Sequence, residues 1–174
     1  MRQSRGFTMI ELMVALAIVA LLAALAAPTA RGMIANGRIR SIGESMSNGL
    51  SLARAEAVRL NTPVAFVRSP LGWSVSRIDT PLVILHGGTG RESAGTDLTL
   101  TNTPADATMS TFDSFGRLVN PNPDGTNAIT RIDIEAQNSA GISNYRPLRI
   151  QVLASGLTRL CDPALAGTEP RACL

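Results

Sequence analysis

The feature that most constrains the fold is an unbroken apolar run near the N-terminus, from Leu12 to Ala27. Taken back to Phe7, the segment holds 21 residues, which as a helix span about 31 Å, close to the thickness of the hydrocarbon core of a bilayer. A short basic leader, residues 1–6, precedes it. The pattern predicts either a membrane-spanning helix over residues 7–27 or an ordinary secretory signal that is cleaved near Ala24-Leu-Ala26.

One carboxylate, that of Glu11, lies inside this apolar segment. An ionised side chain at the centre of a membrane helix costs roughly 2.5–3.5 kcal/mol on insertion scales, so such a group usually has a partner. The obvious partner is a newly exposed N-terminal amine on a neighbouring subunit. This interpretation predicts a cut between Gly6 and Phe7 and helices that pack against one another, and it favours the membrane helix.

The next segment, residues 28–61, continues the helical pattern with a single apolar stripe. Its members recur at spacings of three and four: Ile39, Ile42, Met46, Gly49/Leu50, Ala53, Ala57 and Leu60. Pro63 ends the helix, because a residue that precedes proline avoids helical geometry. We therefore expect one helix from about Phe7 to Leu60, with an amphipathic second half that packs on a sheet.

Residues 62–174 predict a small β-rich head of short strands separated by turns. The expected strands are Val64–Val67, Trp73–Ile78, Leu82–Leu85, Leu98–Leu100, Thr108–Phe112, Ile129–Ile134, Leu148–Leu153 and Leu157–Cys161. The Gly-rich segment 86–97 and the segment 119–127 are expected to be loops. The fold class is therefore α+β: a long N-terminal helix on an antiparallel β-rich head.

Composition excludes several kinds of chemistry. All 16 basic residues are arginine, which removes Schiff-base and P-loop lysine chemistry. His86 is the only histidine and has no sequence sign of a catalytic partner, so we expect no catalytic residues, no metal site and no cofactor. Cys161 and Cys173 lie within the last 14 residues of a chain with an export signal, which predicts a disulfide in an oxidising compartment.

The N-terminal residues Gly6-Phe7-Thr-Met-Ile-Glu11 closely resemble the type IV prepilin motif, and Pro28 falls where many pilin helices carry a proline. The resemblance implies cleavage after Gly6 by prepilin peptidase, N-methylation of Phe7 and a role for Glu11 in assembly. It also implies an inner-membrane subunit with a periplasmic head. An assembly platform then moves this subunit into a filament of other major and minor pilins.

Three further segments are similar to the FimT/GspH subgroup of minor pilins and pseudopilins. They are Leu50–Val67, Phe112-Asp-Ser-Phe-Gly-Arg117 and Val152–Cys161. This resemblance implies a structural subunit that primes or caps a type IV pilus, or alternatively a minor pseudopilin of a type II secretion system. The sequence leaves the choice of system and the order of partners open.

Some FimT-type pilins bind DNA during natural transformation through a C-terminal Gly-Arg-x-Arg element. This implies double-stranded DNA as a further partner and, as another alternative, a predominantly non-structural role as a DNA receptor at the pilus tip. Here the element reads Gly156-Leu-Thr-Arg159 and keeps only the second arginine. Arginines on an exposed strand face and a constrained tail suit binding to DNA phosphates without sequence preference. The candidate DNA-binding residues are Arg146, Arg149, Arg159 and Arg171.

Overall fold

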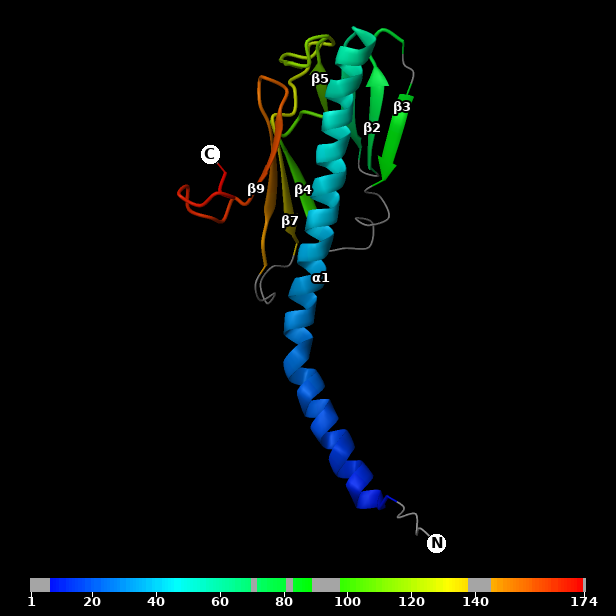
Figure 1. Cartoon of the computed structure of the whole chain (residues 1–174), viewed down its shortest axis with the longest axis vertical. Helices are drawn as coiled ribbons and strands as arrows, with labels where there is room; N and C mark the ends of the chain where they lie inside the picture. The colour runs from blue at the N-terminus through cyan, green and yellow to red at the C-terminus, as the bar shows by residue number, and fades with distance from the viewer. Residues whose placement is uncertain (1–6, 70–71, 81–82, 89–97, 138–144, 174) are drawn as a thin grey trace.

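The computed structural model describes residues 7–69, 72–80, 83–88, 98–137 and 145–173, apart from the side chains of residues 25–31, 83, 86 and 88 (Figure 1). It begins with one long helix, α1 (Met9–Leu60), as the sequence predicts. Thr8 caps its start, because the Thr8 hydroxyl accepts a hydrogen bond from the Glu11 amide. The helix ends where Asn61 adopts the left-handed conformation, two residues before Pro63.

The two halves of α1 differ in how they use their apolar side chains. From Phe7 to Ala24 every side chain is exposed. In the second half the expected stripe is buried against the head, with Leu60 at its edge half-buried. The fully buried members of the stripe are Ile39, Ile42, Met46, Leu50, Ala53 and Ala57.

The strands form two antiparallel sheets. The first has the order β3-β2-β1-β5-β6. Its strands are β1 (Val64–Ser69), β2 (Gly72–Arg77), β3 (Val83–Gly88), β5 (Met109–Phe112) and β6 (Leu118–Val119). The second has the order β4-β7-β8-β9, with β4 (Leu98–Thr103), β7 (Arg131–Ala136), β8 (Leu148–Val152) and β9 (Thr158–Cys161). The predicted α+β class is confirmed.

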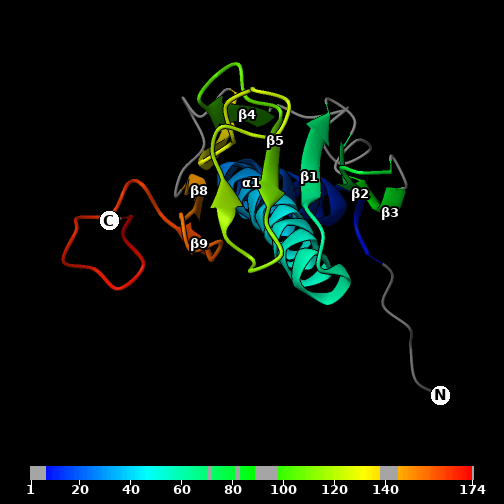
Figure 2. The same ribbon diagram turned by 90° about the horizontal axis from the view of Figure 1, so that it is seen from above.

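Seen from above, the strands form an arc around one side of α1 (Figure 2). The helix approaches β1 and β2 closely at Gly49, because a Cβ there would lie 2.8 Å from the ring of Trp73 and 2.9 Å from the ring of Phe66. Arg68 of β1 ties the two sheets together, since its guanidinium donates to the side chain of Asn102 and to the carbonyl of Leu100 on β4. One core is thus enclosed between α1 and both sheets.

The head departs from the expected pattern in a few places. The two-residue strand β6 was not expected, and the strand expected from Ile129 begins instead at Arg131. The backbone of His86–Gly88 continues β3, whereas the rest of the expected loop, 89–97, lies outside the described residues. The segment 119–127 is a loop after Val119, and it is held by the buried side chain of Asn122, which accepts from the Thr111 amide.

In the part of the chain whose side chains are described, no helix is both long enough and apolar enough to cross a membrane. The expected span, residues 7–27, includes residues 25–27, whose side chains lie outside that part, and it stays a prediction.

Candidate functional site

The start of α1 presents the residues that the sequence marks for processing and assembly. Phe7 and Glu11 are both exposed, and Gly6 lies outside the described residues. Among the described residues the Glu11 carboxylate has no ion-pair partner in its own chain. It stands on a helical surface otherwise made of exposed apolar side chains. This half of the helix therefore leaves both a carboxylate and an apolar surface for other molecules to cover.

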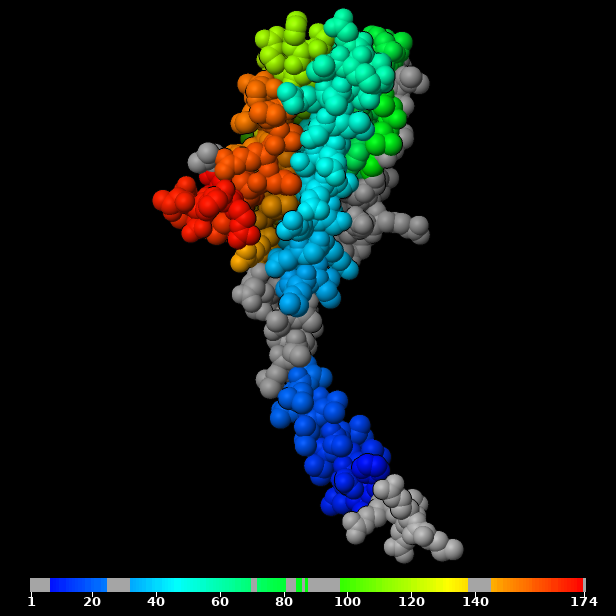
Figure 3. Space-filling view, in the orientation of Figure 1, coloured from blue at the N-terminus to red at the C-terminus, as the bar shows by residue number. Residues whose placement is uncertain are grey.

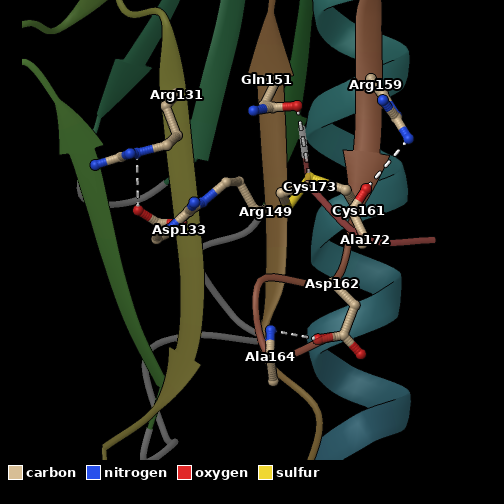
Figure 4. The surroundings of a disulfide bond; sticks show 10 residues. All are labelled: Arg131, Asp133, Arg149, Gln151, Arg159, Cys161, Asp162, Ala164, Ala172 and Cys173. Atoms are coloured by element: carbon tan, nitrogen blue, oxygen red, sulfur yellow. Dashed lines mark hydrogen bonds and ion pairs between the residues drawn. A yellow bond between two sulfur atoms is a disulfide. The ribbon is translucent and has the colours of Figure 1, made fainter. Parts of the chain in front are cut away.

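A second group of candidate residues lies around the disulfide between Cys161 and Cys173, whose Cα atoms are 5.0 Å apart (Figure 4). The bond closes a C-terminal loop, residues 161–173, beyond β9. Inside the loop the Asp162 amide donates to the Arg171 carbonyl, and Cys161 and Ala172 are almost fully buried. The two ends of the loop are thus fixed to each other and to the edge of the second sheet, while most residues between them are exposed.

Arg149 and Arg159 both lie on the face of the second sheet that points away from α1, together with Arg131 (Figure 4). Arg131 lies opposite Gln151, which lies opposite Arg159, so one row of polar side chains crosses three strands. Arg131 was not among the expected DNA-binding residues. Arg131 and Asp133 are two residues apart on an alternating strand, so the sequence could have shown that both side chains lie on the same face.

Arg149 is less exposed than the sequence suggests. Its Nε donates to the Asp133 carboxylate at 2.5 Å, and the other oxygen of that carboxylate lies 3.2 Å from Arg131 Nε. The side chain of Arg149 is only 24% exposed to solvent. Arg159 is also engaged, because its guanidinium donates to the Ala172 carbonyl in the C-terminal loop. The sequence places these two arginines on an exposed strand face, but in the structure their guanidinium groups also connect neighbouring strands and the C-terminal loop.

The other two expected residues, Arg146 and Arg171, lie elsewhere. Both line a groove of about 320 Å³ between α1, the start of β8 and the C-terminal loop. The backbone beside Arg146 is fixed, since its amide donates to the Asn36 side chain at 2.9 Å and the hydroxyl of Tyr145 accepts from the Ala136 amide. Burial raises the pKa of the Tyr145 phenol. The four candidate arginines thus form two separate pairs rather than one cationic surface.

The three segments that resemble the FimT/GspH subgroup meet at one junction. Arg54 of α1 donates through Nε to the Gly116 carbonyl at 3.0 Å. A Cβ at Gly156 would lie 1.8 Å from that same carbonyl oxygen, and Gly156 has a φ of 78°. Both facts require glycine at position 156. The glycine at this position therefore has a structural role: it lets the turn after β8 contact the turn after β5 and the last part of α1.

The turn after β5 is organised by Asp113. Burial would raise the pKa of the Asp113 carboxyl, but hydrogen bonds from the amides of Arg117 and Phe115 and from the Arg117 guanidinium hold it below its ordinary value. Beside the junction, Phe115 is 75% exposed and Leu157 is 51% exposed. Leu157 occupies the position of the first arginine in the DNA-binding element, so this surface is apolar where that element is cationic.

A long N-terminal helix packed on antiparallel sheets is the fold of type IV pilin-like proteins. Two crystal forms of the type IV minor pilin FimU of Pseudomonas aeruginosa share it. One matches with a TM-score of 0.56 and 17% identity over 77% of this chain and 96% of FimU. The other matches with a TM-score of 0.50 and 18% identity over 75% and 98%. At this level of identity the likeness concerns the fold alone.

Sequence similarity defines the family. Residues 1–27 match the model of the prokaryotic N-terminal methylation motif, and residues 43–156 match that of the type II transport protein GspH. The chain belongs to the GspH family of type IV pilin-like proteins, as its motifs predict. It is also 35% identical over 69 residues to the type II secretion system protein H of Xanthomonas campestris pv. campestris. That match spans 40% of this chain and 41% of the relative.

Proposed function

We propose that this chain is a minor, structural subunit of a type IV pilus that primes or caps the filament, with a minor pseudopilin of a type II secretion system as the alternative. The observation that carries the proposal is the first half of α1. Its large apolar side chains are exposed, and its single carboxylate, Glu11, is unpaired within the described part of the chain. Helices of neighbouring pilins would cover this surface in a filament.

In this proposal prepilin peptidase cleaves between Gly6 and Phe7, and the new amine of Phe7 is methylated. The subunit waits in the inner membrane with its head in the periplasm until the assembly platform inserts it among other pilins. Glu11 then meets the N-terminal amine of a neighbouring subunit. A buried carboxylate beside an amine avoids the cost of an isolated charge in an apolar environment.

Intact-mass measurement of the membrane-extracted chain tests the processing step. The expected mature chain comprises residues 7–174 plus one methyl group. Glu11→Val should leave cleavage intact but abolish incorporation into filaments, whereas Met13→Val, an apolar exchange two residues away, should preserve both. A mature chain that starts near Ala27 would instead identify the segment as a cleaved secretory signal.

The two systems are separated by deletion of the gene in its own host. Loss of surface pili with normal protein secretion is expected for the pilus subunit. Loss of secretion with normal pili would support the pseudopilin alternative. Wild-type chain supplied on a plasmid should restore the lost property, and the Glu11→Val chain should not.

Double-stranded DNA is a second candidate partner, favoured by Arg131, Arg149 and Arg159, which share the outer face of the second sheet. Asp133 offsets part of its charge. With three arginines, the slope of log affinity against log salt should be no steeper than about −3. We expect Arg131→Ala in the detergent-solubilised full chain to flatten the slope by about one, and Arg146→Ala to leave it unchanged. A chain that binds no duplex DNA even at low salt has the structural role alone.

A further inference from the structure

The groove that holds Arg146 and Arg171 is not explained by the proposed function. It is lined by residues of α1, of the start of β8 and of the C-terminal loop, which projects from the flank of the head (Figure 3). We propose that this groove is the docking site for an acidic segment of a neighbouring filament subunit, which inserts a carboxylate between the two arginines. The inference rests on the proposed function, because it needs a filament in which subunits pack side by side.

The charge of the groove points to a carboxylate. Within the described residues neither Arg146 nor Arg171 has an ion-pair partner, and both side chains are exposed. A third arginine at the rim, Arg40, is already paired with Glu44 at 2.8 Å along the helix. Two guanidinium groups are therefore left to bind an incoming anion, and arginine suits a planar carboxylate because it donates two parallel hydrogen bonds.

The rest of the groove favours a protein over a polyphosphate. Its lining includes apolar side chains of Ile39, Pro147, Leu148 and Leu160, and its rim also carries the carboxylates of Glu44 and Asp162. The charged side chains of the lining thus sum to only +1, from three arginines and two acids. The phosphates of a DNA strand or a lipid surface bring many negative charges next to these two acids, whereas a single carboxylate needs only the two arginines that have no ion-pair partner within the described residues. A peptide that carries one acidic side chain next to an apolar one matches both parts of the groove.

The walls of the groove are fixed before any partner arrives. On one side the Arg146 amide donates a hydrogen bond to the side chain of Asn36 on α1. On the other side the disulfide and the bond from the Asp162 amide to the Arg171 carbonyl hold the C-terminal loop in place. Preorganised walls reduce the conformational entropy that binding costs. This gives the disulfide a second role besides stability: it holds Arg171 at the groove that Arg146 also lines.

Site-specific crosslinking in the native host tests this docking site. A photoreactive p-benzoylphenylalanine replaces Leu160, an uncharged lining residue that is 37% exposed, and incorporation into sheared filaments is measured in the same cells. The expected product is a crosslink to another pilin, mapped by mass spectrometry to a segment that contains Asp or Glu. Arg146→Glu with Arg171→Glu should lower the crosslink yield at least about tenfold, because each reversal puts like charges together.

The controls separate the groove from general effects of charge and from failure of the proposed function. Arg38→Glu changes an exposed charge on the same helix outside the groove and should retain the crosslink. Arg146→Gln with Arg171→Gln should lower the yield less than the double reversal, and Trp73 fluorescence checks that each variant is folded. Reversal of the mapped acidic residue in the partner to arginine should restore the crosslink of the double Glu variant.

Two results would overturn the docking site while leaving the proposed function intact. One is a chain with both arginines intact that enters filaments but gives no crosslink from position 160, or only one to a segment without acidic residues. The other is a crosslink whose yield does not change in the double Glu variant, or falls equally in Arg38→Glu. A chain that never enters filaments fails the proposed function, and the docking site then fails with it.

Discussion

The two halves of α1 share one continuous backbone but bury their apolar side chains in different ways. Between Phe7 and Ala24 nothing in the described part of the chain covers them, whereas the stripe from Ile39 to Ala57 is buried in the core. The difference shows that the core of the head contains residues from the second half of the helix and none from Phe7 to Ala24. The first half carries apolar surface that nothing in the described part of the chain covers, and the proposed function assigns that surface to contacts with other molecules.

The largest expected effect contrasts one leucine from each half. Leu50 is fully buried, so Leu50→Ala should lower the free energy of unfolding of the head by about 2–5 kcal/mol. Leu16 is 61% exposed, so Leu16→Ala should change it by less than about 0.5 kcal/mol. Chemical denaturation of the detergent-solubilised chain, followed by the fluorescence of Trp73, measures both. Equal effects would contradict the separation of the helix into two functional halves.

The disulfide belongs to the head and should act on that part alone. Its closed loop spans a sequence separation of 12, for which the chain-entropy estimate is about 3 kcal/mol. The double change Cys161→Ala with Cys173→Ala should therefore lower the stability of the head by about that amount, with no change in the helical signal of the first half of α1. Thiol labelling of the unreduced periplasmic chain should find no reactive cysteine; two reactive thiols would disprove the bond.

The same substitution, glycine to alanine, should have opposite effects at two positions of α1, one that packs against the first sheet and one that does not. A Cβ at Gly49 would crowd Trp73 and Phe66, so Gly49→Ala should destabilise the head by about 1 kcal/mol or more despite better helix propensity. A Cβ at Gly37 meets nothing within 4 Å among the described residues, so Gly37→Ala should stabilise the chain by up to about 1 kcal/mol. Thermal unfolding followed by circular dichroism distinguishes the two signs. Stabilisation by both changes would mean that the helix and the first sheet do not pack this closely.

The smallest expected effect is a pH dependence in the head. A hydrogen bond and ion pair from Arg77 lower the pKa of Asp79 to about 2, below its ordinary value of 3.8. A lowered pKa in the folded state stabilises that state above the ordinary pKa, and the contribution disappears as the pH falls through about 2. Wild type should therefore exceed Asp79→Asn slightly in stability above about pH 4 and lose that margin toward pH 2. A margin that does not change with pH would show that the pair is absent in solution.

The sequence predicts the elements whose signal is local. The spacing of Ile39, Ile42 and Met46 marks the buried side of the helix, and most strands follow from alternation and turns. The strand β6 escapes this reasoning because it has only two residues, and its pairing with Thr111 and Phe112 on β5 defines it. Such pairing depends on tertiary register, which is not visible in a short run of residues.

The candidate site shows the same division. The disulfide could be predicted because the spacing of the two cysteines and the export signal are local features of the sequence. The engagement of Arg149 is not, since its partner Asp133 belongs to another strand and meets it only through the register of β7 and β8. The groove brings together residues between Asn36 and Arg171 from three segments, so no single stretch of sequence marks it.

The junction of Arg54, Gly116 and Gly156 has a mechanical consequence. In the proposed filament, tension would pull on the subunit along α1, and strands such as β2 run along the helix rather than across it (Figure 1). Such a pull shears helix against strands, so many side-chain contacts must slip together before the head gives way. At the far end of the helix, the bond from Arg54 to the Gly116 carbonyl and the close contact of Gly156 with that carbonyl spread the load over the turns after β5 and β8. The head would thus resist axial force as one body, with its anchor point at the end most distant from the site of pull.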